Sequence, residues 1–66
     1  MGFKIRKCRE EVGMTQEELS KRSGVSRATI SGLESGRIKV TSTGTLLKIA
    51  DAIGKEVGDL FITGNA

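Results

Sequence analysis

The sequence predicts a small all-α domain of five short helices. Proline is absent, the only aromatic residues are two phenylalanines, and apolar residues recur at helical intervals between glycines. These observations favour short helices over a β-sandwich. With 66 residues the chain has room for a single domain, and a domain of this size buries only about 60% of the surface that its unfolded chain exposes. We therefore treat residues 1–66 as one domain with a small core and a tail at residues 63–66.

The first helix is predicted over residues 3–12. Ile5, Cys8 and Val12 follow helical spacing, so they share one face, which we expect to be buried. Gly13 comes next, and glycine adopts the left-handed conformation that ends many helices without steric cost. Cys8 is the only cysteine, so we expect a reduced thiol that behaves as a small buried apolar side chain.

The second helix is predicted from Thr15 to about Ser23 and Gly24. It opens with the sequence TQEE, which is a capping box: the Thr15 hydroxyl can accept a hydrogen bond from the Glu18 backbone N–H, while the Glu18 carboxylate reaches back to Thr15. Gly24 can take a positive φ angle and turn the chain sharply. Two short helices joined by a tight turn containing glycine form a helix-turn-helix.

The third helix is predicted over residues 26–35, with Ser26 as its N-cap and Gly36 as its stop. A helix this short is marginal alone, since isolated helices below ~12 residues are rarely stable, so packing must hold it. On a helical projection Ile30 and Leu33 point to the core. The outer face is then flat and built from small side chains, with basic and polar residues at its edge: Ala28, Ser31, Gly32 and Ser35, flanked by Arg27 and Thr29.

An arm over residues 37–41 leads to a fourth helix, capped near Ser42 and ended by Gly54. We expect the apolar residues of this helix to belong to the core and not to a ligand site: Leu46, Leu47, Ile49, Ala50 and Ile53. A fifth, weaker helix is predicted over residues 57–62. Gly58 lies within it and costs roughly 0.5–1 kcal/mol relative to alanine.

Positive charge is concentrated in the middle of the chain. The net charge is +3, from 11 basic and 8 acidic residues, but residues 19–50 hold six basic residues against a single acidic one. This concentration indicates a polyanionic partner, or else a basic face that is simply solvated. A flat face with basic edges suits the major groove of DNA, where phosphates meet the rims and base edges meet the centre.

The segment MTQEELSKRSGVSRATISGLESGR, residues 14–37, resembles the helix-turn-helix domain of phage repressors and Cro proteins, the XRE-like family of bacterial and phage regulators. The resemblance extends from about Ile5 to Phe61 and includes TLLKIADAIG, which matches the family's fourth helix. It places the helix-turn-helix unit at about residues 15–36. It implies a repressor-like fold and sequence-specific binding to double-stranded DNA.

The resemblance also implies roles for individual residues. Base contacts would come from the outward positions of the third helix: Arg27, Ala28, Ser31 and Gly32. Phosphate contacts would come from the second helix, the flanks of the third and the arm: Gln16, Ser26, Thr29, Arg37 and Lys39. Since Ala28 and Gly32 replace longer side chains common in the family, direct readout would rest mainly on Arg27, through paired hydrogen bonds to guanine. Arg9 and Glu34 match a buried structural ion pair.

A dimer is expected, because one short helix reads only a few base pairs. The expected target is an inverted repeat with half-sites about one helical turn apart. In this family the natural dimer surface is the fifth helix with the tail, here Leu60, Phe61 and Ile62. The expected role is a transcriptional repressor that occludes polymerase.

Several other functions are disfavoured by composition. The chain has no histidine, one cysteine and no phosphate-cradling glycine loop, so we expect no enzyme, metal, cofactor or small-molecule ligand. No apolar run approaches the roughly 20 residues of a membrane span, which favours a cytoplasmic protein. Two alternatives stay open: a protein-interaction module that keeps the fold with little DNA specificity, and an antitoxin-like protein that depends on a partner.

Overall fold

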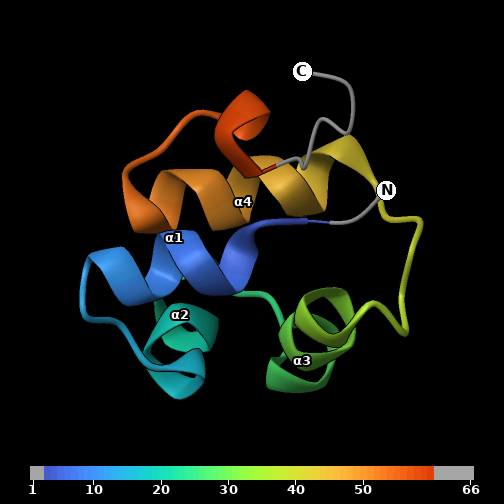
Figure 1. Cartoon of the computed structure of the whole chain (residues 1–66), viewed down its shortest axis with the longest axis horizontal. Helices are drawn as coiled ribbons and strands as arrows, with labels where there is room; N and C mark the ends of the chain where they lie inside the picture. The colour runs from blue at the N-terminus through green and yellow to red at the C-terminus, as the bar shows by residue number, and fades with distance from the viewer. Residues whose placement is uncertain (1–2, 61–66) are drawn as a thin grey trace.

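The computed structural model describes residues 3–60, which form four α-helices and a short 3-10 helix. The elements are α1 (Ile5–Glu11), α2 (Gln16–Ser23), α3 (Arg27–Ser35), α4 (Thr43–Ile53) and the 3-10 helix η1 (Val57–Leu60). In Figure 1, α4 crosses the upper half of the molecule with η1 above it, while α2 and α3 lie below α1. Helix α2 packs against both α3 and α4, and η1 packs against α4. The predicted all-α class is confirmed.

The predicted count of five helices is not confirmed, because the described part of the segment expected to form the fifth helix forms only η1. The Asp59 carboxylate accepts a hydrogen bond from the Glu56 backbone N–H at 3.2 Å, and the Asp59 N–H donates to the Glu56 carbonyl at 2.9 Å. An aspartate that binds nearby backbone competes with an α-helix, and Gly58 lowers the helix propensity further. Of the predicted residues 57–62, the last two lie outside the described residues.

Three helices begin at the predicted N-caps. Each cap accepts a hydrogen bond from the backbone N–H three residues later: Thr15 at 3.0 Å, Ser26 at 3.2 Å and Ser42 at 3.1 Å. These bonds satisfy donors that have no partner inside the first helical turn. The capping box at Thr15 is only half formed, because the Glu18 carboxylate bonds Arg22 at 3.1 Å and does not return to Thr15. The caps therefore set the helix starts as the sequence predicts.

The apolar core lies between the four helices and η1 (Figure 1). Its members are all at most 8% exposed: Ile5, Cys8, Met14, Leu19, Val25, Ile30, Leu33, Leu46, Ile49, Ala50, Ile53 and Leu60. Two residues predicted for the core are not in it, since Val12 is 47% exposed and Leu47 is 54% exposed. Val12 follows the last residue of α1 as its C-cap, so it leaves the helical face of Ile5 and Cys8. Leu47 is turned toward solvent because neighbouring helix residues differ by about 100°.

Adjacent leucines on α4 provide a matched test of this core. Leu46 is 5% exposed and Leu47 is 54% exposed. We expect Leu46→Ala to lower the free energy of unfolding by about 2–5 kcal/mol, because it removes buried surface and leaves a cavity. We expect Leu47→Ala to lower it by less than about 1 kcal/mol. Urea unfolding followed by far-ultraviolet circular dichroism measures both, and equal losses would contradict the assignment.

Candidate nucleic-acid interface

The turn that joins α2 to α3 is closed by hydrogen bonds from both of its ends. Gly24 has a φ of 76° and donates its N–H to the Ser20 carbonyl at 2.9 Å. The Ser20 hydroxyl donates to the Val25 carbonyl at 2.7 Å, and Val25 is buried in the core. Helices α2 and α3 therefore form the expected helix-turn-helix. No pattern in the sequence predicted this hydrogen bond of Ser20.

A polar network joins α1, α2 and α3 behind this turn. Arg9 and Glu34 pair through two hydrogen bonds, Nε to Oε2 at 2.8 Å and Nη2 to Oε1 at 3.1 Å. Their side chains are only 11% and 5% exposed, so the ion pair expected from the resemblance is present and buried. The remaining Arg9 nitrogen, Nη1, donates to the Met14 carbonyl at 2.8 Å. Hydrogen bonding to Glu34 raises the pKa of Arg9 above its ordinary value, against the opposing effect of burial, so Arg9 stays charged.

Gln16, the first residue of α2, belongs to the same network. Its Nε2 donates to Glu34 Oε1 at 2.9 Å, and the residue is half-buried. An amide nitrogen carries two hydrogens, so one of them stays available for a second acceptor. Gln16 is thus held at the N-terminus of α2 with one N–H group still available. The N-terminus of a helix favours the binding of an anion.

Helix α3 exposes the N-terminal half of its outer face. Arg27 and Ala28 are exposed, and Ser31 is half-buried. The Ser26 hydroxyl donates to the Thr29 hydroxyl oxygen at 2.8 Å. The Thr29 hydroxyl therefore keeps its own proton for another acceptor, such as a phosphate oxygen. The structure brings these predicted base-contacting and phosphate-contacting residues onto one surface.

Gly32 is buried, so the prediction that it contacts bases is wrong. The arm after α3 folds back over it: the Ile38 N–H donates to the Gly32 carbonyl at 2.9 Å. A Cβ atom at Gly32 would lie 2.5 Å from Ile38 Cδ1. A helical projection gives the angle of a residue around the axis but says nothing about a following loop that covers that angle. Arg37 and Lys39, on either side of Ile38, are both exposed.

The basic residues of α3 and the arm differ from those of α2 in their partners. On α2, Lys21 Nζ lies 3.8 Å from a carboxylate oxygen of Glu17, and Arg22 Nη2 lies 3.1 Å from one of Glu18. Five exposed cations have no such partner among residues 3–60: Lys7 on α1, Arg27 on α3, Arg37 and Lys39 in the arm, and Lys48 on α4. Three of these five lie on α3 and the arm that follows it, and their positive charge attracts polyanions.

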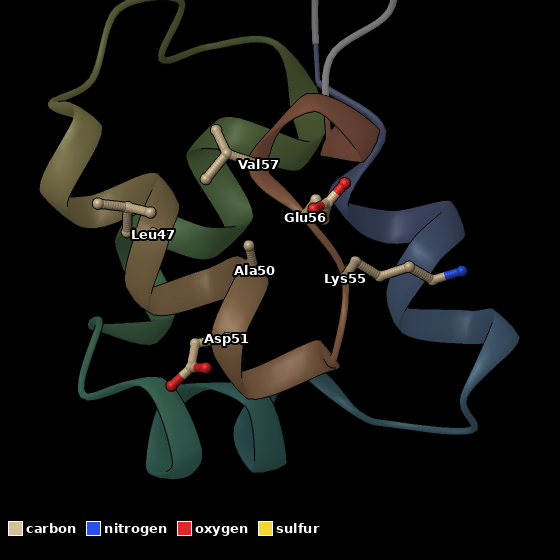
Figure 2. A pocket seen from close by; sticks show the side chains of 6 residues that line it. All are labelled: Leu47, Ala50, Asp51, Lys55, Glu56 and Val57. Atoms are coloured by element: carbon tan, nitrogen blue, oxygen red, sulfur yellow. The ribbon is translucent and has the colours of Figure 1, made fainter.

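A shallow hollow of about 260 Å³ lies between α4 and the segment leading to η1 (Figure 2). Its walls are mixed in character: Leu47, Ala50, Asp51, Lys55, Glu56 and Val57. Lys55 points toward α1 in Figure 2, and its Nζ lies 3.1 Å from Glu11 Oε1. That hydrogen bond raises the pKa of Lys55 above its ordinary value. The cation that lines this hollow, Lys55, is therefore already paired with Glu11.

Neither a metal site nor a membrane span is found in the part of the chain that the structure describes. Within residues 3–60, no group of three or more histidine, cysteine, aspartate or glutamate side chains is placed to hold a metal ion. No helix in that range is long and apolar enough to cross a membrane.

The arrangement of the helices agrees with a comparison to known families. A family model described as helix-turn-helix matches residues 5–60. This chain belongs to the XRE-like helix-turn-helix family. The match begins at the start of α1 and ends with η1, so the XRE-like domain includes every helix described above.

Curated XRE-like relatives share the description "uncharacterized HTH-type transcriptional regulator". One, from Methanothermobacter thermautotrophicus, is 49% identical over 61 residues, which cover 88% of this chain and 84% of the relative. Another, from Archaeoglobus fulgidus, is 45% identical over 62 residues, covering 94% and 87%. A third, from Sinorhizobium fredii, is 43% identical over 54 residues, covering 82% and 69%. The similarity to these regulators thus spans most of both chains.

Of the three residues expected to form a dimer surface, the structure describes only Leu60. Leu60 has no exposed surface and belongs to the core, and its carbonyl accepts a hydrogen bond from the Lys4 N–H at 2.6 Å. A side chain enclosed in this way does not supply a contact to a second subunit, so the prediction for Leu60 is wrong. Phe61 and Ile62 lie outside the described residues. The 3-10 geometry of η1, which turns Leu60 inward, was not evident from the apolar pattern.

Two arginines on α1 allow the buried ion pair to be tested. We expect Arg9→Ala to lower the free energy of unfolding by about 3–5 kcal/mol, because it leaves the Glu34 carboxylate buried without a counter-charge. The matched control is Arg6→Ala, which breaks a pair with Glu10 whose side chains are 71% and 57% exposed. We expect a loss of at most about 1 kcal/mol there. Urea unfolding would reject the assignment if the two variants behaved alike.

Proposed function

We propose that this protein is a DNA-binding transcriptional regulator that inserts α3 into the major groove of a specific site. The observation that carries the proposal is the exposed outer face of α3, which is free of acidic side chains and edged by unpaired cations. Major-groove readout needs a surface that comes close to base edges while phosphates meet basic rims. The relatives described as HTH-type transcriptional regulators support the same function.

The contacts would divide into base readers and phosphate binders. Arg27 would read a guanine through paired hydrogen bonds, with Ala28 against a thymine methyl group and Ser31 at a neighbouring base edge. Phosphates on the two rims would be bound by Gln16, Ser26, Thr29 and Lys39. The spare donors of Gln16 and Thr29 described above suit this role.

The further expectation is a repressor that binds an inverted repeat as a dimer. The exposed outer face of α3 is short, because the arm covers Gly32. One subunit would therefore read few base pairs. Two subunits related by a two-fold axis would supply useful affinity. With Leu60 in the core, the dimer contacts would lie elsewhere, including Phe61 and Ile62. Sedimentation of the protein on its selected DNA measures the stoichiometry, and one subunit per site at saturation would exclude the dimer.

The proposal predicts that Arg27→Ala loses sequence discrimination. The site would first be selected from random duplexes and then titrated by fluorescence polarisation at several salt concentrations. We expect Arg27→Ala to lose about 1–3 kcal/mol of discrimination at one base pair. Lys39→Ala should weaken all sequences to a similar degree and reduce the dependence of affinity on salt.

Lys21→Ala on the solvent side of α2 is the matched control, because Lys21 is already paired with Glu17. It should bind nearly like wild type. If no motif is enriched and all variants bind weakly and alike, the fold serves another purpose. The small side chains of α3 would then favour a protein-interaction module, and co-purification with a stoichiometric partner would favour an antitoxin-like role.

A further inference from the structure

The arm after α3 is fixed in register against the helix that precedes it. Gly36 reverses the chain with a φ of 84°, and the Ile38 N–H then donates to the Gly32 carbonyl at 2.9 Å. Ile38 is half-buried and packs against the core cluster. The residue between these two anchors, Arg37, is therefore held beside α3 and does not extend away along a free loop.

Gly32 leaves an opening on α3 that the arm fills. A Cβ atom at Gly32 would lie 2.5 Å from Ile38 Cδ1, 2.7 Å from Ile38 Cγ1 and 3.1 Å from Arg37 Nη2. The Arg37 guanidinium group thus occupies the space that a side chain at position 32 would enter. Arg37 is exposed and forms no ion pair with the described residues. Its donors are free to bind a ligand that approaches α3.

We propose that Arg37 is a specificity-determining residue that contacts a base edge in place of the missing side chain at position 32. This inference rests on the proposed DNA-binding function and changes the role of Arg37 from phosphate contact to base reader. Gly32 lies five positions after Arg27, about 7.5 Å along the helix axis at 1.5 Å per residue. Base pairs stack about 3.4 Å apart, so the base pair read by Arg37 differs from the one read by Arg27.

Arg37→Lys separates charge from geometry. Lysine keeps the positive charge but lacks the planar fork that makes paired hydrogen bonds to guanine. Binding would be measured by polarisation on the selected site and on its single-base-pair variants. We expect Arg37→Lys to keep the wild-type salt dependence and to lose roughly tenfold discrimination at one base pair. A phosphate-binding Arg37 would instead leave discrimination by Arg37→Lys unchanged, and that result overturns the inference.

Gly32→Ala tests the same contact from the helix. The added methyl group displaces Ile38 and Arg37, so discrimination should fall at the base pair that Arg37→Lys affects. In the double variant Gly32→Ala/Arg37→Lys the fall at that base pair should not exceed the larger single effect, because both changes remove one contact. Alanine favours a helix over glycine, which supports folding of the variant, and circular dichroism checks it.

Gly44→Ala is the matched control for Gly32→Ala. Gly44 also lies inside a helix, but the nearest atom to its added Cβ would be Ser42 Oγ at 3.9 Å, an ordinary contact. This variant should keep full discrimination. If Gly32→Ala also keeps it, the inference about Arg37 is wrong. Absence of any base preference in the wild-type protein would overturn the proposed function as well, whereas a preference that Arg37→Lys and Gly32→Ala both leave intact overturns only the role of Arg37.

Discussion

The Arg9–Glu34 ion pair is the constraint on which the arrangement of the helix-turn-helix depends. It joins α1 to α3, and through Gln16 it also fixes the start of α2. Helix α3 has nine residues, too few to be stable alone, and only Ile30 and Leu33 anchor it with large buried side chains. Apolar contacts hold such a helix but permit small rotations. A buried charge pair with paired hydrogen bonds permits much smaller rotations of the helix, because misalignment would leave a charge unsatisfied.

The network also connects stability with the proposed DNA-binding surface. Glu34 is scaffold, yet one of its oxygens holds the Gln16 amide at the edge of the outer surface. The Ser26 hydroxyl also has two roles, because it caps α3 and orients the Thr29 side chain through a second hydrogen bond. Side chains already ordered in this way lose less conformational entropy on binding than free ones. The interface is thus prepared by the same bonds that start and join the helices.

Local chemistry made most of this fold predictable from the sequence. The caps at Thr15, Ser26 and Ser42 and the turn at Gly24 depend on neighbouring residues alone, and the structure has them where the residue types indicate. The ion pair followed from the family resemblance, since 25 residues separate its partners and no local pattern connects them. The features that the sequence did not predict depend on contacts between residues far apart in the chain. The fold-back of Ile38 onto Gly32 and the burial of Leu60 against the core both depend on tertiary packing, which the apolar pattern alone does not reveal.

Because Ile38 packs over Gly32, the surface around α3 is formed partly by the helix and partly by the loop that follows it. The helix is tied to the core through Ile30 and Leu33, so changes at these two residues carry a risk for the whole domain. Loops tolerate substitution far better than the elements they connect. A lineage of such proteins could therefore acquire new preferences by varying the position before Ile38 while the packed helix stays unaltered. With Arg37 in its proposed role, glycine at position 32 makes the loop the more evolvable half of the surface.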